Sequence, residues 1–130
     1  MGARTPADVH RLFTKHFASG DMDGLIALYE PDAVLYPEPG KRAFGRTEIR
    51  EVLGGFLALQ GRFDMKPARV AQAGDTAILC ADWTLEAKAP DGSAIHLAGQ
   101  TADVVRRQPD GTWLFIIDCP FGATGISLPV

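Results

Sequence analysis

The chain has 130 residues, of which 46% are hydrophobic and 22% charged, and its formal net charge is -3. These values are typical of a globular domain with its own core, so we expect a single domain over residues 1–130. No segment is rich in Lys and Arg, which argues against nucleic acid and anionic membranes as partners. No apolar run reaches bilayer-spanning length and the N-terminus has no secretory signal, so we expect a cytoplasmic protein.

The sequence offers no motif for a metal or a cofactor. Its two cysteines, Cys80 and Cys119, lie in strand-like segments without a second Cys or His at ligand spacing. In a reducing compartment we expect them to be free thiols. There is no glycine-rich phosphate loop, and no two histidines have the spacing of metal ligands. We therefore expect neither a metal nor a cofactor.

The first helix is predicted to begin near residue 5. Thr5 suits the N-cap and Pro6 the first helical position. Apolar residues then recur at steps of three and four, including Phe13 and Phe17, and Ser19-Gly20 ends the helix. His16 falls on this apolar face and is expected to be a core histidine.

A short second helix is expected to start at Asp21 or Asp23 and to include Tyr29 before Pro31 stops it. Residues 33–36 resemble a short strand. The following stretch, residues 37–42, is rich in Pro and Gly and is expected to be a loop.

A third helix is predicted from about residue 46 to 59, with Val52 and Phe56 on its buried side. Two glycines, Gly54 and Gly55, lie in its middle, where each costs about 1 kcal/mol relative to alanine. Either another element packs closely there or the helix simply tolerates them.

The second half of the chain predicts an antiparallel sheet. Strand-like segments alternate with turn sequences that contain Gly, Asp and Pro, and the strands are expected near residues 63–73, 76–88, 94–107 and 112–119. Three helices followed by such strands indicate an α+β fold with the helices on one face of the sheet.

Several short motifs occur in a characteristic order: Gly20-Asp21, Asp23-Gly24-Leu25, Leu28-Tyr29, Asp32-Ala33-Val34, Gly45-Arg46-Thr47-Glu48-Ile49-Arg50, Ala73-Gly74-Asp75 and the run from Val104 to Trp113. Over nearly the whole chain, their order and spacing resemble the ketosteroid isomerase and SnoaL-like cyclase branch of the nuclear transport factor 2-like superfamily. The resemblance implies a cystatin-like fold with three helices on a strongly curved antiparallel sheet, a conical pocket between them, and a homodimer formed through the outer sheet face. The superfamily contains both enzymes and binding modules, so the fold alone does not decide the function.

In the steroid isomerases a carboxylate transfers a proton, while a tyrosine and a protonated aspartic acid stabilise the dienolate oxygen. Asp103 matches the position of the protonated acid, and it also interrupts an otherwise uncharged strand. A side chain facing solvent or a dimer partner is the alternative. Phe13 occupies the tyrosine position and Pro37 the position of the base, which argues against steroid isomerase activity. Glu38, next to Pro37, is the candidate replacement for the base.

Asp118 is the second candidate acid, since it is the only charge in the run from Leu114 to Cys119. If the last hairpin closes with a two-residue turn, Asp103 faces Ile116 and Asp118 shares its face. A glycine bulge at Gly111 would shift the register and separate the two faces. The family match favours the shared face, where two carboxyls in one apolar cavity would have split pKa values. The alternative is that Asp118 only rigidifies the sheet through a backbone amide or the Trp83 indole.

The resemblance also implies which residues line the ligand pocket: Phe13, Phe17, Tyr36, Val52, Phe56, Ala81, Trp83, Leu85, Thr101, Val105 and Ile116. Tyr36 is the expected substitute for the hydroxyl that Phe13 lacks. His10 is expected to be exposed, and His96 to lie on the strand face opposite Asp103.

Three functions remain open at this level. The favoured one is a cofactor-independent isomerase, cyclase or dehydratase acting on a small, largely apolar carbonyl compound through the carboxyls Asp103 and Asp118. The second is a module that binds a small apolar molecule without turnover. The third is an interaction protein that uses its outer sheet face.

Overall fold

The computed structural model describes residues 2–126. Its longest helices are α1 (Pro6–Ala18) and α3 (Gly45–Ala58), with the short α2 (Met22–Ile26) between them. The start of α1 is a capping box, in which the Thr5 side chain accepts from the Asp8 backbone N–H and the Asp8 carboxylate accepts from that of Thr5. The expected start of the first helix is thus confirmed.

The second helix is shorter than predicted, and this changes the position of Tyr29. The helix ends at Ile26, and Tyr29 is the first residue of strand β1 (Tyr29–Leu35), where it pairs with Phe115. Pairing with a central strand buries Tyr29 completely. The prediction that Tyr29 belongs to a helix is therefore wrong, because sheet pairing outweighs the local helical pattern.

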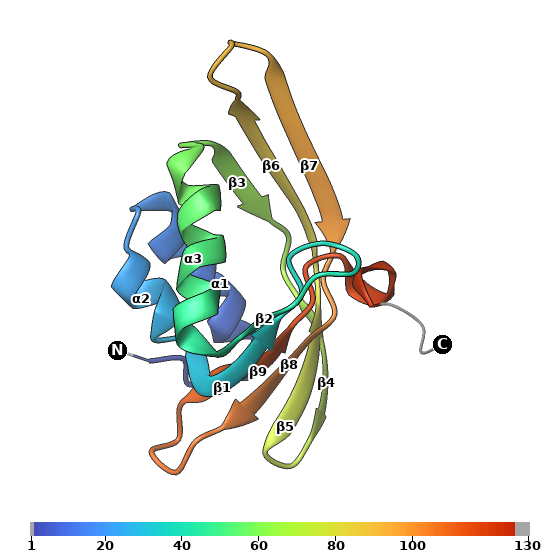
Figure 1. Cartoon of the computed structure of the whole chain (residues 1–130). Helices are drawn as coiled ribbons and strands as arrows, with labels where there is room; N and C mark the ends of the chain where they lie inside the picture. The colour runs from blue at the N-terminus through green and yellow to red at the C-terminus, as the bar shows by residue number, and fades with distance from the viewer. Residues whose placement is uncertain (1, 127–130) are drawn as a thin grey trace.

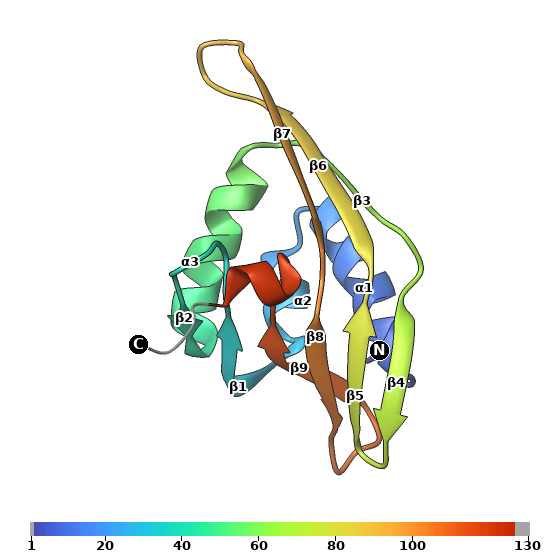
Figure 2. The same ribbon diagram turned by 90° about the vertical axis from the view of Figure 1, so that its right-hand side faces the viewer.

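The strands form two sheets that share one strongly curved surface (Figures 1 and 2). The larger sheet has the order β2-β1-β9-β8-β5-β4, and the smaller one the order β3-β6-β7. The remaining strand bounds are β2 (Ala43–Phe44), β3 (Arg62–Met65), β4 (Arg69–Ala73), β5 (Thr76–Cys80), β6 (Asp82–Lys88), β7 (Ala94–Gln100), β8 (Asp103–Arg107) and β9 (Trp113–Asp118). A short 3-10 helix, Gly122–Gly125, follows the last strand.

Each of the three long predicted strands is in fact two strands, one in each sheet. The breaks fall at residues 66–68, at Ala81 and at residues 101–102. Two of these breaks are joined to each other, since the Thr101 N–H donates to the Ala81 carbonyl over 2.8 Å and the Thr101 hydroxyl accepts from the Ala81 N–H over 3.1 Å. These breaks let the sheet bend around the helices.

The helices cover the concave side of the curved sheet, and the β6–β7 hairpin extends beyond them (Figure 1). The core fills the space between these layers and contains Val9, Leu25, Tyr29, Ile49, Leu79, Leu85, Val105 and Phe115. This arrangement confirms the α+β fold with three helices on a curved sheet. The sheet is mixed rather than purely antiparallel, because β1 runs parallel to β9.

The glycine pair in α3 does not mark a close contact. A Cβ at Gly55 would meet nothing within 4 Å, and one at Gly54 would meet only the Met22 Cε at 3.7 Å. Of the two readings of this pair, simple tolerance is the one that the structure supports.

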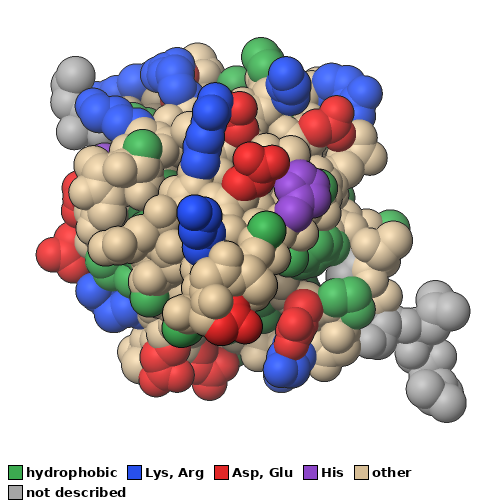
Figure 3. Space-filling model, turned by 90° about the horizontal axis from the view of Figure 1, so that it is seen from above, with side chains coloured by type: hydrophobic (Ala, Val, Ile, Leu, Met, Phe, Trp, Pro, Cys, Tyr) green, Lys and Arg blue, Asp and Glu red, His purple; other side chains and the backbone are tan. Residues whose placement is uncertain are grey.

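Seen from above, the surface carries acidic and basic side chains interspersed with one another (Figure 3). Such a mixture produces no extended field of one sign on this face. Within residues 2–126, no helix is both long enough and apolar enough to cross a membrane.

Candidate functional site

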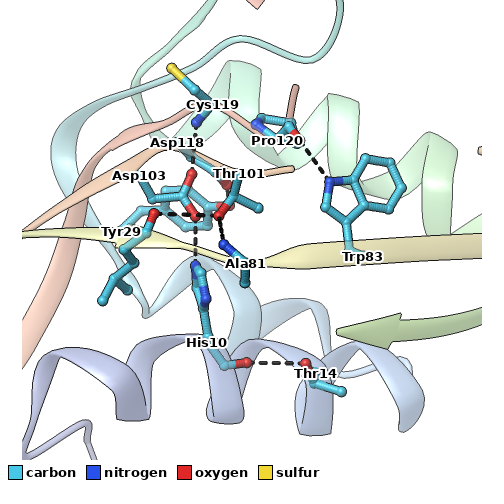
Figure 4. A network of polar contacts seen from close by, with 11 residues as sticks. His10, Thr14, Tyr29, Ala81, Trp83, Thr101, Asp103, Asp118, Cys119 and Pro120 are labelled. Carbon is cyan, nitrogen blue, oxygen red and sulfur yellow. Dashed lines mark hydrogen bonds and ion pairs between the residues drawn. The ribbon is translucent and has the colours of Figure 1, made fainter. Parts of the chain in front are cut away.

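A cavity of about 70 Å³ lies between the helices and the concave side of the sheet. On a scale where one water molecule needs roughly 10–15 Å³, it has room for about five water-sized groups. Its wall is mostly aromatic and aliphatic, and consists of His10, Phe13, Phe17, Leu35, Pro37, Leu53, Phe56, Phe63, Met65, Trp83, Leu85, Thr101, Asp103, Phe115, Asp118, Pro120 and Phe121. The polar groups on this wall come together where β8 begins and β9 ends (Figure 4).

Asp103, the first residue of β8, is only 1% exposed, and both of its carboxylate oxygens have partners. Oδ1 accepts from the Cys119 backbone N–H over 2.8 Å. Oδ2 lies 2.6 Å from Nε2 of His10, which reaches it from α1 (Figure 4). These contacts stabilise a buried carboxylate that would otherwise be costly.

Asp118, the last residue of β9, is 7% exposed and lies beside Asp103 on the same cavity wall. The Tyr29 hydroxyl donates a hydrogen bond of 2.5 Å to its Oδ2. Tyr29 is thus the phenol at this site, and the expectation that Tyr36 would replace the missing hydroxyl is wrong: Tyr36 is half-buried and is not part of the cavity wall.

Two irregularities in the β8–β9 hairpin bring the two carboxyls to one face. Near the turn, Arg107 pairs with Trp113, which is the register of the glycine bulge, and Gly111 has a φ of 85°. Further along, Val105 pairs with Phe115 but Val104 pairs with Ile117, so Ile116 is an extra residue. Of the two turns that the sequence permits, the one with the glycine bulge forms. The second bulge shifts the register by one more residue, and because side chains alternate with a period of two, the total shift of two residues restores the shared face.

His10 was expected to be exposed, and this is wrong, because the residue is only 4% exposed. Its side chain points from α1 toward the sheet, where Asp103 accepts its hydrogen bond and Phe115 packs with a ring-centroid distance of 6.1 Å. His10 lies on the same buried face of α1 as Phe13 and Phe17. The buried acid that accepts its hydrogen bond lies 93 positions away in the sequence.

Burial raises the pKa values of the two carboxyls and lowers the pKa of the histidine. It raises the pKa of Asp103 to about 6. The pKa of Asp118 is raised well above its usual range, first by burial and then by the Asp103 charge and a hydrogen bond shared with Asp103. Burial lowers the pKa of His10 to about 4, although the Asp118 charge opposes this. The two carboxyls therefore hold their protons to higher pH than ordinary aspartates do, whereas the His10 imidazole is neutral at pH 7.

The structure places six of the predicted pocket residues on the cavity wall: Phe13, Phe17, Phe56, Trp83, Leu85 and Thr101. The other five, Tyr36, Val52, Ala81, Val105 and Ile116, lie outside it. Ala81 and Val105 are buried in the sheet, and Ile116 is the bulged residue. Whether the wall residues bind a ligand stays a prediction.

The remaining predicted groups have partners of their own. The Trp83 indole N–H donates to the Pro120 carbonyl over 2.6 Å, so Asp118 does not receive it. Glu38 is exposed and forms a 2.7 Å ion pair with Lys41, away from the cavity wall. His16 is half-buried and lies 3.3 Å from Asp21, and His96 is exposed beside Glu86.

Tyr29 and His10 are the two polar side chains of the site that the sequence pattern did not reveal. The available signals are weak, since Tyr29 lies four residues before the predicted strand at 33–36 and His10 lies three residues before Phe13 on the first helix. Neither signal identifies a partner, because both hydrogen bonds depend on the register of the last hairpin.

A polar cluster of this kind suits proton transfer. A carboxylic acid donates a hydrogen bond or a proton, a carboxylate stabilises positive charge, and a neutral imidazole accepts a proton. The apolar wall keeps these groups away from bulk water, which strengthens their electrostatic interactions. Among the described residues, no group of three or more His, Cys, Asp or Glu side chains is placed to hold a metal ion.

Residues 9–115 match the model of the SnoaL-like domain. The chain therefore belongs to the SnoaL-like domain family. No curated protein matches it.

Several solved structures share the fold. A ketosteroid isomerase-like protein from Erwinia carotovora atroseptica is 22% identical, with 86% of this chain and 88% of that chain covered and a TM-score of 0.71. A nuclear transport factor 2-like superfamily protein from Salmonella enterica is 18% identical, with 87% and 84% covered and a TM-score of 0.74. A protein from Streptomyces avermitilis, described as a candidate dehydratase of the same family, is 19% identical, with 86% and 91% covered and a TM-score of 0.72. At these identities the likeness shows the fold.

Proposed function

We propose that this protein is a cofactor-independent acid–base enzyme, of the isomerase, cyclase or dehydratase type, that acts on a small and largely apolar carbonyl compound. The observation that carries the proposal is the buried pair Asp103 and Asp118 on the wall of an apolar cavity, where burial raises the pKa of both carboxyls. Pairs of carboxyls with separated pKa values are a common basis for general acid and base catalysis.

In this proposal Asp118 is the acid. Burial raises its pKa and so favours the protonated form, which donates a hydrogen bond or a proton to the carbonyl oxygen of the substrate. Asp103 is the anionic partner, whose charge stabilises the positive charge that a neighbouring base acquires when it removes a proton from the same substrate. Tyr29 holds the Asp118 carboxyl in place through its 2.5 Å hydrogen bond.

The cavity limits the size of the substrate. A cavity of about 70 Å³ favours a substrate about the size of one small ring, whereas a steroid would require the aromatic wall to move. The position of the steroid isomerase base is taken by Pro37, which has no proton to exchange. Proton removal next to a carbonyl is common to isomerisation and dehydration, and the description of the Streptomyces avermitilis structure agrees with the latter.

The test is deuterium exchange in heavy water with a panel of small enolisable ketones and aldehydes, followed by NMR. The wild type is expected to catalyse exchange beside the carbonyl of at least one compound. Asp118→Asn and Asp103→Asn should each reduce the rate at least about 100-fold while circular dichroism shows a folded protein. Asp64→Asn, which changes an exposed carboxylate, is the matched control. Full activity in both cavity variants would contradict the proposed roles.

A module that binds a small apolar molecule without turnover is the second candidate. It is favoured by the replacement of two catalytic positions of the steroid isomerases by Phe13 and Pro37. In that case a ligand bound in the cavity would be recovered unchanged after long incubation, and no compound in the exchange panel would react.

A further inference from the structure

His10 has one ring nitrogen that the hydrogen-bond network leaves unused. Its Nε2 lies 2.6 Å from Oδ2 of Asp103, whereas its Nδ1 is fully buried and has no hydrogen-bond partner among the described residues. Buried polar atoms are nearly always paired, so an unpaired nitrogen on the wall of a cavity needs an explanation.

The partner of Nε2 determines the tautomer of the ring. Oδ1 of Asp103 accepts from the Cys119 N–H, and its Oδ2 also requires a donor. A neutral imidazole has one N–H, so Nε2 carries the hydrogen and donates it to Asp103. Nδ1 is then an acceptor with a free lone pair.

Within residues 2–126, no neighbouring group supplies a donor to this lone pair. The Tyr29 hydroxyl donates to Asp118, and the Thr14 hydroxyl, one turn along α1, donates to the His10 carbonyl over 3.1 Å. Thr101 is engaged with the backbone of Leu79 and Ala81. Because His10 forms part of the cavity wall, a donor for Nδ1 can come from a molecule in the cavity.

We propose that Nδ1 of His10 is the proton acceptor of this site, and that its ligands are enolisable carbonyl compounds with an acidic C–H or O–H directed at this nitrogen. The inference rests on the proposed function and deepens it, since it names the base and the substrate class. His10, which lies on α1, takes the place of the base that the chain lacks at Pro37.

Asp103 is poorly placed to be the base itself. It is only 1% exposed, and both its oxygens already accept hydrogen bonds. It is a positioning residue that fixes the tautomer of His10 and stabilises the imidazolium formed when Nδ1 takes a proton.

The proton transfer is balanced without any co-reactant. The C–H bond next to the carbonyl breaks, its proton forms a new N–H bond at Nδ1, and the electron pair moves through the carbon–carbon bond onto the carbonyl oxygen. Asp118 donates its hydrogen bond to that oxygen. Return of the proton from Nδ1 to another carbon, as the electron pair moves back from the oxygen, gives an isomer. Where the next carbon bears a hydroxyl or alkoxy group, the returning electron pair breaks that C–O bond, the departing oxygen takes the proton from Nδ1, and water or an alcohol leaves.

The first part of the test observes the nitrogen directly. In protein with ¹⁵N-labelled histidine, the His10 signals are assigned by comparison with His10→Gln and the tautomer is determined from their chemical shifts. We expect Nε2 to be protonated and Nδ1 to be bare. Titration with phenol, a small O–H donor, should move the Nδ1 signal. A protonated Nδ1 in the free protein, or an Nδ1 signal that does not respond while phenol saturates the cavity, would overturn the proposal.

The second part uses activity with matched variants. His10→Gln keeps an N–H able to reach Asp103 but has no acceptor at the position of Nδ1, and it should lower deuterium exchange at least about 100-fold. His16→Gln, on the same helix outside the cavity wall, should leave the rate unchanged. Retained exchange in a folded His10→Gln would overturn the proposal and leave the proposed function intact. If the wild type exchanges no compound but Nδ1 responds to phenol, the proposed function fails and the acceptor site stands.

Discussion

At the scale of single residues, two carboxyls from neighbouring strands are held by donors from three other places. Tyr29 on β1 donates to Asp118, His10 on α1 donates to Asp103, and the Cys119 backbone donates to Asp103. Because the donors come from separate elements, each carboxyl has a fixed orientation toward the cavity.

Tyr29→Phe removes the only side-chain hydroxyl that the structure places on Asp118. We expect the free energy of unfolding to fall by about 1–3 kcal/mol, because a buried carboxyl loses a donor. The pKa of Asp118 should rise further, since this hydrogen bond lowers it. Urea denaturation measures the first effect. Tyr36→Phe, which changes a half-buried tyrosine outside the cavity wall, is the control and should have an effect below about 0.5 kcal/mol.

The pH dependence of stability should reveal His10. Its pKa in the folded protein is lowered to about 4 from an ordinary 6.5. The unfolded chain therefore takes up this proton first, so the contribution of His10 to stability is present above pH 6.5 and is lost as the pH falls through 4. The two carboxyls that face His10, Asp103 and Asp118, have raised pKa values and act in the opposite sense.

We therefore expect the stability of the wild type relative to His10→Gln to decrease by up to about 3 kcal/mol between pH 6.5 and pH 4. Urea denaturation at several pH values measures this difference. A difference that stays constant over the range would show that the pKa of His10 is not lowered by folding.

The sequence identified Asp103 and Asp118 because a charge in an otherwise uncharged strand is costly unless it has a purpose. It did not identify their partners. Tyr29 lies in a segment whose local pattern favours a helix, and His10 is one of several polar residues on a helix. Each acquires its role only through a contact across about 90 positions of sequence.

At the scale of elements, the β8–β9 hairpin decides the geometry of the site. The turn sequence permits two registers, and the bulge at Ile116 shifts the one that forms by a further residue, which returns Asp118 to the face of Asp103. The strand bounds and the turns at residues 74, 92 and 111 could be predicted, since glycines with positive φ occupy all three. The second bulge could not, because no residue in the run from Leu114 to Ile117 is typical of a bulge.

The helix α3 offers a test of packing at this scale. Gly55→Ala should raise the free energy of unfolding by about 1 kcal/mol, because the position is helical, exposed and open around the added Cβ. Gly99→Ala is the contrasting variant, since its Cβ would lie 2.8 Å from the Pro120 carbonyl oxygen and 2.9 Å from the Trp83 Nε1. Thermal unfolding should show stabilisation in the first variant and destabilisation in the second. Destabilisation by Gly55→Ala would mean that another element approaches α3 there.

At the scale of the whole molecule, the fold was predictable because each level of the sequence agrees with it. The helical periods, the turn residues and the motif order all lead to three helices on a curved sheet. The sequence pattern did not predict where the curved sheet breaks. Three predicted strands are each divided in two, at residues 66–68, 81 and 101–102.

The homodimer stays a prediction. On the outer face of the sheet, Ile78, Val104 and Ile117 lie side by side on β5, β8 and β9, and Ile78 is 47% exposed. If a second copy covers this row, Ile78→Lys should produce a monomer, as measured by light scattering. Val70→Lys, an exposed position on β4 that pairs with the inward-facing Leu79, should not. A wild type that is monomeric at high concentration would contradict the prediction.

Two neighbouring buried carboxyls share one cavity, and burial raises the pKa of each. Titration of the aspartate carboxyl ¹³C signals by NMR, assigned with Asp103→Asn and Asp118→Asn, measures both pKa values directly. We expect Asp103 to titrate near pH 6 and the pKa of Asp118 to lie well above that of an ordinary aspartate. Two carboxyls that both titrate near pH 4 would contradict this expectation, because burial would then have raised neither pKa.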